Sequence, residues 1–361
     1  MGCVVAARGV EASVPEMMRA MVTTRHGGPE VVESRRVPVP RAGPGQVLVR
    51  VGAAGCNNTD LWTRDGAYPS PDGTAGRGGW LGPLDFPRVQ GGDVAGTVVA
   101  CGAGTDTSLV GARVLVDPAL YEGPDRDARP VDVLGSERDG GFAEYAVVPE
   151  QCAHRVNGSP LSDLELAALP IAYGTALAMV LRGGVVEGST VVVTGASGGV
   201  GLAAVQLARA RGARVVAVCS ATKGGEVLAA GADAVVDRQR GAVVEDIARV
   251  APEGVHVVID VVAGETLGPG LGLLRPGGRW VVAGALDGWR VELDVRRLYL
   301  ANVSLVGSTM HTPAIFEELV GLALRGEVRP QIAATFSLED LGVAQARLAQ
   351  REHVGKLMIV P

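Results

Sequence analysis

The sequence predicts an α/β protein in which a doubly wound parallel sheet is joined to a β-rich domain. Three observations predict it. From about residue 185 the pattern strand, glycine turn, helix repeats along the chain. The first strand of that series, 190–194, is continuously apolar, as in a parallel sheet that is buried on both faces. Residues 18–160 instead contain short strands separated by Gly and Pro turns.

Composition narrows the class of protein further. The chain has 361 residues, enough for one or two domains, and combines 52 glycines and 47% hydrophobic residues with only 4% aromatic residues. Its net charge of -6, with no basic patch, argues against a nucleic-acid partner. No apolar run reaches the roughly 18 residues that a membrane helix needs. We therefore expect no membrane association.

The N-terminus and the cysteines predict a cytoplasmic protein. No charged start followed by an apolar core marks a signal peptide. Residues 1–17 precede the first predicted strand, and either an extension or an upstream start codon explains them. The five cysteines are odd in number and form no CxxC pair, which indicates reduced thiols instead of a disulfide framework.

In the β-rich part, 46–51 and 96–100 are examples of predicted strands. Two long segments interrupt it. Residues 69–87 are Gly-rich and contain Trp80, and residues 118–139 are rich in Pro, Asp and Arg. Loops this long in compact domains are usually functional or mobile.

The second half supplies the parallel sheet. After the 190–194 strand, Val200, Ala204, Leu207 and Ala208 share one face of a predicted helix. Further strands are expected at 214–219, 255–262, 279–283 and 304–307, and residues 309–361 return to helix and strand.

The segment between the first strand and its helix predicts a dinucleotide site. Small residues let the backbone approach a pyrophosphate, and the helix N-terminus offers free N–H groups and positive potential. Ala196 stands at the first position of the strict G-x-G-x-x-G pattern, and a structural glycine turn is the alternative. The residues expected to bind the cofactor here are Ala196, Ser197, Gly198, Gly199, Val200 and Gly201.

The end of the 214–219 strand favours NADPH over NAD. NAD enzymes usually place Asp or Glu at this point to bind the ribose 2′-OH. Here the chain has Ser220 and, three residues on, Lys223, which offer a hydroxyl and an ammonium to a 2′-phosphate. A solvated role for Lys223 is the alternative, but the missing acid still argues against NAD.

Five blocks of sequence together resemble the medium-chain dehydrogenase/reductase family. They are 55–60 (GCNNTD), 91–96 (GGDVAG), 140–145 (GGFAEY), the 195–201 turn and 353–356 (HVGK). The resemblance covers residues 18–361. It implies a GroES-like β-rich catalytic domain built from residues 1–172 and 307–361, around a Rossmann dinucleotide-binding domain of residues 173–306. The substrate cleft is expected between them.

The chain departs from the zinc-binding members of that family. Those members use Cys, His and Cys ligands with water in the fourth position. The matching positions here hold Asn57, Gly92 and Ile171, and Cys56 lies one residue off the first of them. Residues 118–139 contain no Cys, so the structural zinc lobe is missing too. We expect no metal, and the pattern resembles the zinc-free quinone oxidoreductase and enoyl reductase branch.

That branch implies roles for further residues. Asn57 and Thr59 would stabilise negative charge on a substrate carbonyl, and Tyr68 or bound water would protonate the product. Asp60 is placed in the catalytic set, with helix capping as its alternative. Trp62 and Tyr68 would face the substrate or simply pack. The remaining expectations are substrate contacts from Trp80 and Ile171, and cofactor contacts from Thr175, Asp260, Val261, Gly284, Ala285 and Lys356, the last near the phosphates.

The sequence therefore predicts an NADPH-dependent reductase that transfers hydride, without zinc, to an electron-poor C=C bond of an apolar unsaturated carbonyl or a quinone. Two alternatives stay open. One is a pathway-specific natural-product reductase that couples conjugate hydride addition to cyclisation of a polyenone. The other is a non-catalytic NADPH-binding or structural protein. A homodimer is also expected by resemblance, with the 304–307 strand at a pairing sheet edge.

Overall fold

The predicted parallel sheet is confirmed in the computed structural model, which describes residues 14–68, 78–125 and 127–361. All its neighbouring strands are parallel, in the order β13-β12-β11-β14-β15-β16. This is the order 3-2-1-4-5-6 of a doubly wound dinucleotide-binding fold. Its strands are β11 (Thr190–Val193), β12 (Arg214–Cys219), β13 (Ala234–Asp237), β14 (Val255–Asp260), β15 (Leu274–Val282) and β16 (Ser304–Gly307).

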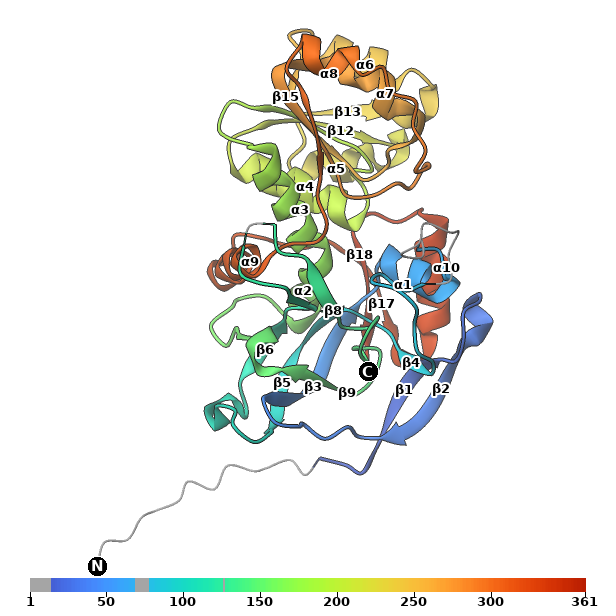
Figure 1. The fold of residues 1–361 in the computed structure, drawn as a ribbon, viewed down its shortest axis with the longest axis vertical. Helices are drawn as coiled ribbons and strands as arrows, with labels where there is room; N and C mark the ends of the chain where they lie inside the picture. Colours follow the sequence, from blue (N-terminus) through green and yellow to red (C-terminus); the bar gives the residue numbers. More distant parts are fainter. Residues whose placement is uncertain (1–13, 69–77, 126) are drawn as a thin grey trace, which may run out of the picture.

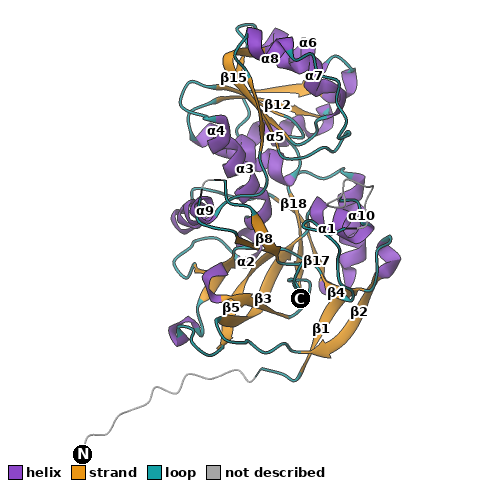
Figure 2. Ribbon diagram, viewed as in Figure 1, coloured by secondary structure: helices purple, strands orange, loops and turns teal. Residues whose placement is uncertain are grey.

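Helices cover both faces of this sheet because successive side chains of each strand point to opposite sides. Val191 and Val193 pack into one buried cluster with residues of α3 and α4. Val192, between them, packs into a second cluster with Ile247 of α6 and Leu267 of α7. Figure 2 shows the two helical layers. The helices are α3 (Pro170–Gly183), α4 (Gly199–Ala210), α5 (Gly224–Ala229), α6 (Val243–Val250), α7 (Leu267–Gly270) and α8 (Arg296–Leu300).

The β-rich part is built mainly on a seven-stranded sheet in the order β10-β6-β5-β3-β18-β17, with β9 also pairing to β3. A three-stranded sheet, β2-β1-β4, and the β7-β8 pair accompany it. The strands are β1 (Met17–Thr23), β2 (Val32–Pro38), β3 (Gln46–Gly55), β4 (Arg88–Val89), β5 (Asp93–Cys101), β6 (Arg113–Val116), β7 (Ala119–Tyr121), β8 (Pro130–Val133), β9 (Tyr145–Pro149) and β10 (Ala153–Arg155).

The C-terminal end of the chain returns to this β-rich part. Strand β18 (Lys356–Val360) pairs antiparallel with β3 and parallel with β17 (Ile332–Ser337). In Figure 1 the red C-terminal strands lie beside the blue and cyan strands of the first third. This pairing brings the first residue of β18, Lys356, next to the end of β3. The helices of the β-rich part are α1 (Asn58–Asp65), α2 (Asp163–Ala167), α9 (Pro313–Arg325) and α10 (Leu341–Gln350).

One continuous helix, α3, runs across the predicted domain boundary between residues 172 and 173, so that boundary stays a prediction. Part of the predicted 69–87 loop and most of the 1–17 extension lie outside the described residues. None of the helices in the described part of the chain is long and apolar enough to cross a membrane.

Candidate active site between the two sheets

The turn between β11 and α4 has the close backbone packing that a dinucleotide cradle requires. Gly195 has φ of 58°, in the left-handed region that favours glycine. A methyl group placed on Gly201 would lie 2.2 Å from the Gly195 carbonyl oxygen, so only glycine fits there. The first N–H groups of α4 have no intrahelical acceptor and project from this turn. These residues fit a dinucleotide pyrophosphate.

A second set of polar groups surrounds Asn57, which directly precedes α1. The Asn57 Oδ1 atom accepts a hydrogen bond from Lys356 Nζ at 2.6 Å. The Asn57 Nδ2 atom donates to Asp93 Oδ2 at 2.8 Å and more weakly to the Gly55 carbonyl at 3.4 Å. Both ends of the amide are therefore occupied within the protein. The expectation that Asn57 donates to a substrate oxygen differs from this arrangement, in which the amide braces the start of α1.

Hydroxyl groups on and after α1 offer a donor instead. The Tyr68 phenol donates to Thr59 Oγ1 at 2.9 Å, which leaves the hydrogen of the Thr59 hydroxyl available to a substrate. Burial raises the pKa of Tyr68 to about 12, so the phenol stays protonated at neutral pH. The Tyr68 ring stacks with Trp80 and meets Trp62 edge to face, with ring centroids 6.3 and 5.6 Å apart. The hydroxyl pair thus lies against an aromatic wall.

Asp60 has the capping geometry that sequence reasoning left as the alternative. Its Oδ2 atom accepts a hydrogen bond from the Asn57 backbone N–H at 2.7 Å, at the start of α1. The side chain is buried and does not line the pocket. Burial, reinforced by Asp93, raises the pKa of Asp60 to about 7 despite this hydrogen bond.

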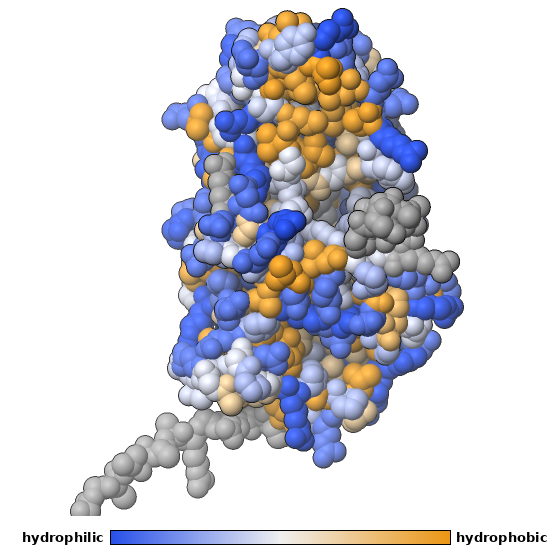
Figure 3. All heavy atoms as spheres, in the orientation of Figure 1, coloured by the Kyte–Doolittle hydropathy of each residue, from blue (hydrophilic) through white to orange (hydrophobic). Residues whose placement is uncertain are grey.

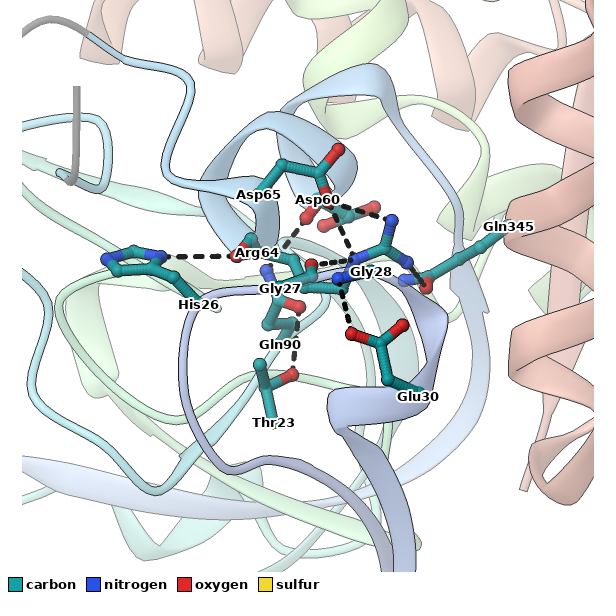
Figure 4. Close-up of polar contacts among 10 residues, drawn as sticks. All are labelled: Thr23, His26, Gly27, Gly28, Glu30, Asp60, Arg64, Asp65, Gln90 and Gln345. Atoms are coloured by element: carbon teal, nitrogen blue, oxygen red, sulfur yellow. Dashed lines mark hydrogen bonds and ion pairs between the residues drawn. The ribbon is translucent and has the colours of Figure 1, made fainter. Parts of the chain in front are cut away.

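The far end of α1 is held by a separate polar cluster, shown in Figure 4. The buried Arg64 guanidinium donates from Nη1 to Gln345 Oε1 of α10 at 2.6 Å and from Nε to the Gly27 carbonyl at 3.2 Å. Gln90 Nε2 donates to the Asp60 carbonyl at 2.9 Å and so also holds the first turn of the helix. These contacts fix the helix that presents Thr59.

A pocket between the two parts of the molecule brings most of the predicted residues together. Its lining includes predicted residues from both parts: Asn57, Thr59, Trp62, Tyr68, Trp80, Ile171, Thr175, Gly198, Gly199, Val200, Gly201, Val261, Gly284 and Lys356. The predicted residues that do not line it are Asp60, Ala196, Ser197, Ser220, Lys223, Asp260 and Ala285. The dinucleotide turn and the Thr59–Tyr68 pair therefore face the same space.

Two predicted cofactor residues make contacts that differ from expectation. The Asp260 carboxylate is buried and accepts from Thr194 Oγ1 at 2.6 Å and Trp280 Nε1 at 2.8 Å, so it braces strands β11, β14 and β15. The ammonium of Lys356, expected near the phosphates, bonds Asp93, Asn57 and the Cys56 carbonyl. Only its aliphatic stem lies against Gly199 of the turn.

The predicted 2′-phosphate residues lie at the end of β12. The Ser220 hydroxyl shares a hydrogen bond of 3.3 Å with Thr222 Oγ1. Lys223 Nζ donates to the Arg351 carbonyl. Burial and the nearby Arg238 lower the pKa of Lys223. The structure thus adds Arg238, which follows β13, as a cation near this corner.

Sequence reasoning missed several lining residues, among them Leu286, Thr309, Met310 and Leu348. Thr309 and Met310 follow closely on β16. Ligands of doubly wound sheets bind outside the carboxyl ends of the strands, and that rule could have indicated both residues. Leu348 comes from α10, which no local signal connects to the cleft.

Comparison with known proteins identifies the chain. Residues 43–158 match the alcohol dehydrogenase GroES-like domain, and residues 199–325 match the zinc-binding dehydrogenase domain. The acryloyl-coenzyme A reductase of Metallosphaera sedula is 30% identical over 95% of this chain and 99% of its own length. The chain belongs to the medium-chain dehydrogenase/reductase family.

Two further similarities place it within the family. Human quinone oxidoreductase is 29% identical over 93% of this chain and 95% of its own length. A solved structure from Sinorhizobium meliloti 1021, described as an alcohol dehydrogenase, has a TM-score of 0.92 and 41% identity, covering 97% of this chain and 98% of that one. These similarities support the quinone oxidoreductase and enoyl reductase branch, and an enzyme that is an oxidoreductase.

The zinc-ligand positions of the family do not fit a zinc ion in this member. The Asn57 amide is bonded to Lys356 and Asp93. A methyl group on Gly92 would lie 2.8 Å from Ile171 Cδ1, so the Ile171 side chain fills the space beside the second position. Within residues 14–68, 78–125 and 127–361, no group of three or more His, Cys, Asp or Glu side chains could hold a metal.

Proposed function

We propose that this protein is an NADPH-dependent reductase that transfers hydride to an electron-poor C=C bond of an apolar unsaturated carbonyl or a quinone, without zinc. One observation carries the proposal. A single pocket is lined by the dinucleotide turn, by the Thr59–Tyr68 hydroxyl pair and by an apolar wall. The relatives named above as quinone oxidoreductase and acryloyl-coenzyme A reductase support this substrate class.

NADPH would lie along the turn and the adjoining strand ends. The backbone of 198–201 would receive the pyrophosphate at the start of α4. Thr175 and Gly284 line the pocket and would hold the nicotinamide end. Ser220 and Lys223, with Arg238 nearby and no carboxylate at the end of β12, would receive the 2′-phosphate. When bound, the cofactor supplies a hydride to the β-carbon of the acceptor.

The Thr59 hydroxyl would hold the carbonyl oxygen of the acceptor. Tyr68 donates to Thr59 Oγ1, and this polarises the Thr59 O–H toward a second acceptor. A donor placed where negative charge develops stabilises the enolate more than the neutral substrate. The Tyr68 phenol, protonated at neutral pH, would return a proton through Thr59 or a water molecule. Trp62, Trp80 and Ile171 would pack on the apolar part of the substrate.

The absence of zinc chemistry rests on the residues present. A Lewis acid at this point would need three donor side chains. The three positions hold Asn57, whose amide is already hydrogen-bonded to Asp93 and Lys356, together with Gly92 and Ile171. An activated C=C bond accepts hydride with hydrogen-bond assistance alone, whereas an alcohol or a simple aldehyde gains more from a metal.

The test is NADPH oxidation by the purified protein against a panel of quinones, enones and simple aldehydes, with metal content measured on the same sample. Turnover of enones or quinones at a zinc content well below one per chain is expected. Aldehyde reduction with stoichiometric zinc would contradict the proposal. Tight NADPH binding without turnover of any panel member would favour a specialised substrate or a non-catalytic role instead.

We also propose that the protein is a homodimer. Strand β16 is the last strand of the six-stranded sheet, so its outer edge has no neighbour in the described sheet. Large apolar side chains gather on and before it, with Trp289 81% and Leu300 74% exposed, together with Val295, Tyr299 and Leu305. Figure 3 shows apolar surface on this upper part of the molecule. Two copies pairing along β16 about a twofold axis would cover both features.

A further inference from the structure

The ammonium of Lys356 is held entirely by the protein. Lys356 Nζ donates to Asn57 Oδ1 at 2.6 Å, Asp93 Oδ2 at 2.8 Å and the Cys56 carbonyl at 2.9 Å. An ammonium has three hydrogens, so these three acceptors use all of them. Lys356 and Asp93 are only 4% and 0% exposed. A contact from this ammonium to a cofactor phosphate would require breaking buried charge-assisted bonds.

The Asp93 carboxylate joins segments that are distant in the sequence. Its Oδ2 atom accepts from Asn57 Nδ2 at 2.8 Å, at the start of α1. Its Oδ1 atom accepts from the Ile171 backbone N–H at 2.7 Å, in the first turn of α3, where helix N–H groups lack intrahelical partners. One carboxylate thus links positions 57 and 171, at the starts of the two helices that present Thr59 and Thr175.

The same lysine reaches the dinucleotide turn through its stem. A methyl group on Gly199 would lie 3.0 Å from Lys356 Cδ and 3.5 Å from Ala172 Cβ, so the turn packs closely on both. The preceding residue adds a backbone contact, because Gly355 N–H donates to the Ser197 carbonyl at 3.0 Å. The start of β18 therefore touches the turn on one side and α1 on the other.

We propose that the buried Lys356–Asp93 ion pair is a positioning device that holds α1, α3 and the dinucleotide turn in register, and that Lys356 is not a phosphate ligand. The role of this alignment in catalysis rests on the proposed function. The alignment of the three elements sets the position of the Thr59 hydroxyl relative to the nicotinamide end of the pocket. Both residues act through Asn57 and Ile171, and neither needs to touch substrate.

The test compares Lys356→Met, Asp93→Asn, the double variant and Lys356→Arg, using melting temperature, NADPH affinity by fluorescence titration, and kcat and KM for one accepted enone or quinone. Methionine keeps much of the stem against Gly199 and removes the charge. Lys356→Met leaves Asp93 charged, buried and unpaired, and the melting temperature is expected to fall by roughly 10 °C. The expected loss of turnover is at least tenfold in kcat with less than threefold change in NADPH Kd.

The double variant provides the decisive comparison. Without the lysine, the Asn57 amide is free to turn so that Asn57 Oδ1 accepts from the new amide at position 93, and neither position 93 nor position 356 then carries a buried charge. Compared with Lys356→Met, the double variant is expected to recover more than half of the fall in melting temperature and part of the fall in kcat. Lys356→Arg should not restore turnover, since a planar guanidinium does not match three acceptors arranged around a point charge.

The phosphate-ligand role makes the opposite forecast. It requires Lys356→Met to raise the NADPH Kd tenfold or more with little change in melting temperature, and the double variant to bind no better; that result would overturn the proposal. Arg211→Met is the control, since Arg211 pairs with Glu318 at the surface and its loss should shift the melting temperature by less than about 2 °C. Melting temperature and NADPH affinity are measured without an enone or quinone substrate, so these two measurements remain decisive if the proposed reductase activity fails.

Discussion

Tyr68 donates its phenolic hydrogen to Thr59 Oγ1 across 2.9 Å. Thr59 lies in the first turn of α1, whereas Tyr68 follows the end of that helix. The contact fixes the direction of the Thr59 hydroxyl and leaves its own hydrogen available to the pocket. With the Asn57 amide bonded to Lys356 and Asp93, this pair is the polar group on which the proposed chemistry depends.

Removing the Thr59 hydroxyl should slow turnover. Thr59→Val keeps the shape and loses the donor, and we expect kcat for an enone or quinone to fall on the order of 100-fold, as for other oxyanion donors. Thr59→Ser keeps the donor and should retain activity within about tenfold. Steady-state kinetics at saturating NADPH provide the measurement. Equal activity of the valine and serine variants would remove Thr59 from the mechanism.

Cofactor binding should depend on Gly201. In Gly201→Ala the new methyl group would lie 2.2 Å from the backbone oxygen of Gly195, so the turn must move. We expect the NADPH Kd, measured by fluorescence titration, to rise at least roughly tenfold, a loss of about 1.4 kcal/mol or more. Gly225→Ala is the control, because a methyl group there meets no atom within 4 Å. An unchanged Kd for Gly201→Ala would show that the cradle is misassigned.

Asp60 should make stability depend on pH. Burial raises its pKa from 3.8 to about 7 in the folded chain, so the folded state holds this proton more tightly than the unfolded state. The contribution of Asp60 to the free energy of unfolding is therefore fully present below pH 3.8 and is lost as the pH rises toward 7. Above pH 7 this contribution no longer changes with pH. Asp60→Asn keeps an acceptor for the Asn57 N–H, and its free energy of unfolding should exceed that of the wild type by roughly 2 kcal/mol at pH 8.

Urea unfolding at pH 5 and pH 8 measures this difference, which should shrink at pH 5, where the wild-type carboxyl is protonated. The exposed Asp85→Asn is the matched control and should show no such change between the two pH values. A variant that is less stable than the wild type at pH 8 would mean that the ionised carboxylate stabilises α1.

The far end of α1 should also contribute to stability. Arg64→Met removes hydrogen bonds to Gln345 and to the Gly27 carbonyl from a buried site (Figure 4), and leaves their oxygen atoms without this partner. We expect a loss of about 2–3 kcal/mol in the free energy of unfolding by urea. Arg155→Met removes an exposed ion pair to Asp106 and should cost less than about 1 kcal/mol. Equal losses in the two variants would contradict the role of the cluster.

The proposed dimer can be disrupted at its apolar surface. Tyr299→Asp with Leu300→Asp places two carboxylates on exposed apolar positions beside β16. Light scattering after size-exclusion chromatography should give about 74 kDa for the wild type, twice the 36.9 kDa of one chain, and a monomer for the variant. Val186→Asp, at an exposed apolar site in the loop before β11, which does not neighbour β16, is the control and should stay dimeric. A monomeric wild type would end the proposal.

The sequence by itself determined the parallel sheet, the dinucleotide turn and most of the pocket residues. Strand, turn and helix follow one another directly in such a unit, so apolar runs and glycine spacing report them locally. Strands β12 and β16 have the predicted limits, whereas β15 begins at Leu274, earlier than the predicted 279–283 strand. Its Pro276-Gly277-Gly278 segment reads as a turn, and it forms an irregularity within the strand, between the paired residues Leu274 and Arg279.

Only the tertiary structure decided what the polar side chains do. Lys356 and Asn57 are separated by 299 positions, and Arg64 and Gln345 by 281. The pairing of the sheets determines which segments lie next to a buried charge and can supply its partner. A partner is required because an unpaired buried charge carries a large desolvation penalty. For this reason the sequence indicates that Asn57, Asp60, Asp260 and Lys356 belong near the site but does not indicate what they bind. Only the fold shows that Lys356 bonds to Asn57 and Asp93. It likewise shows that Asp60 caps the start of α1 and that Asp260 accepts from Trp280.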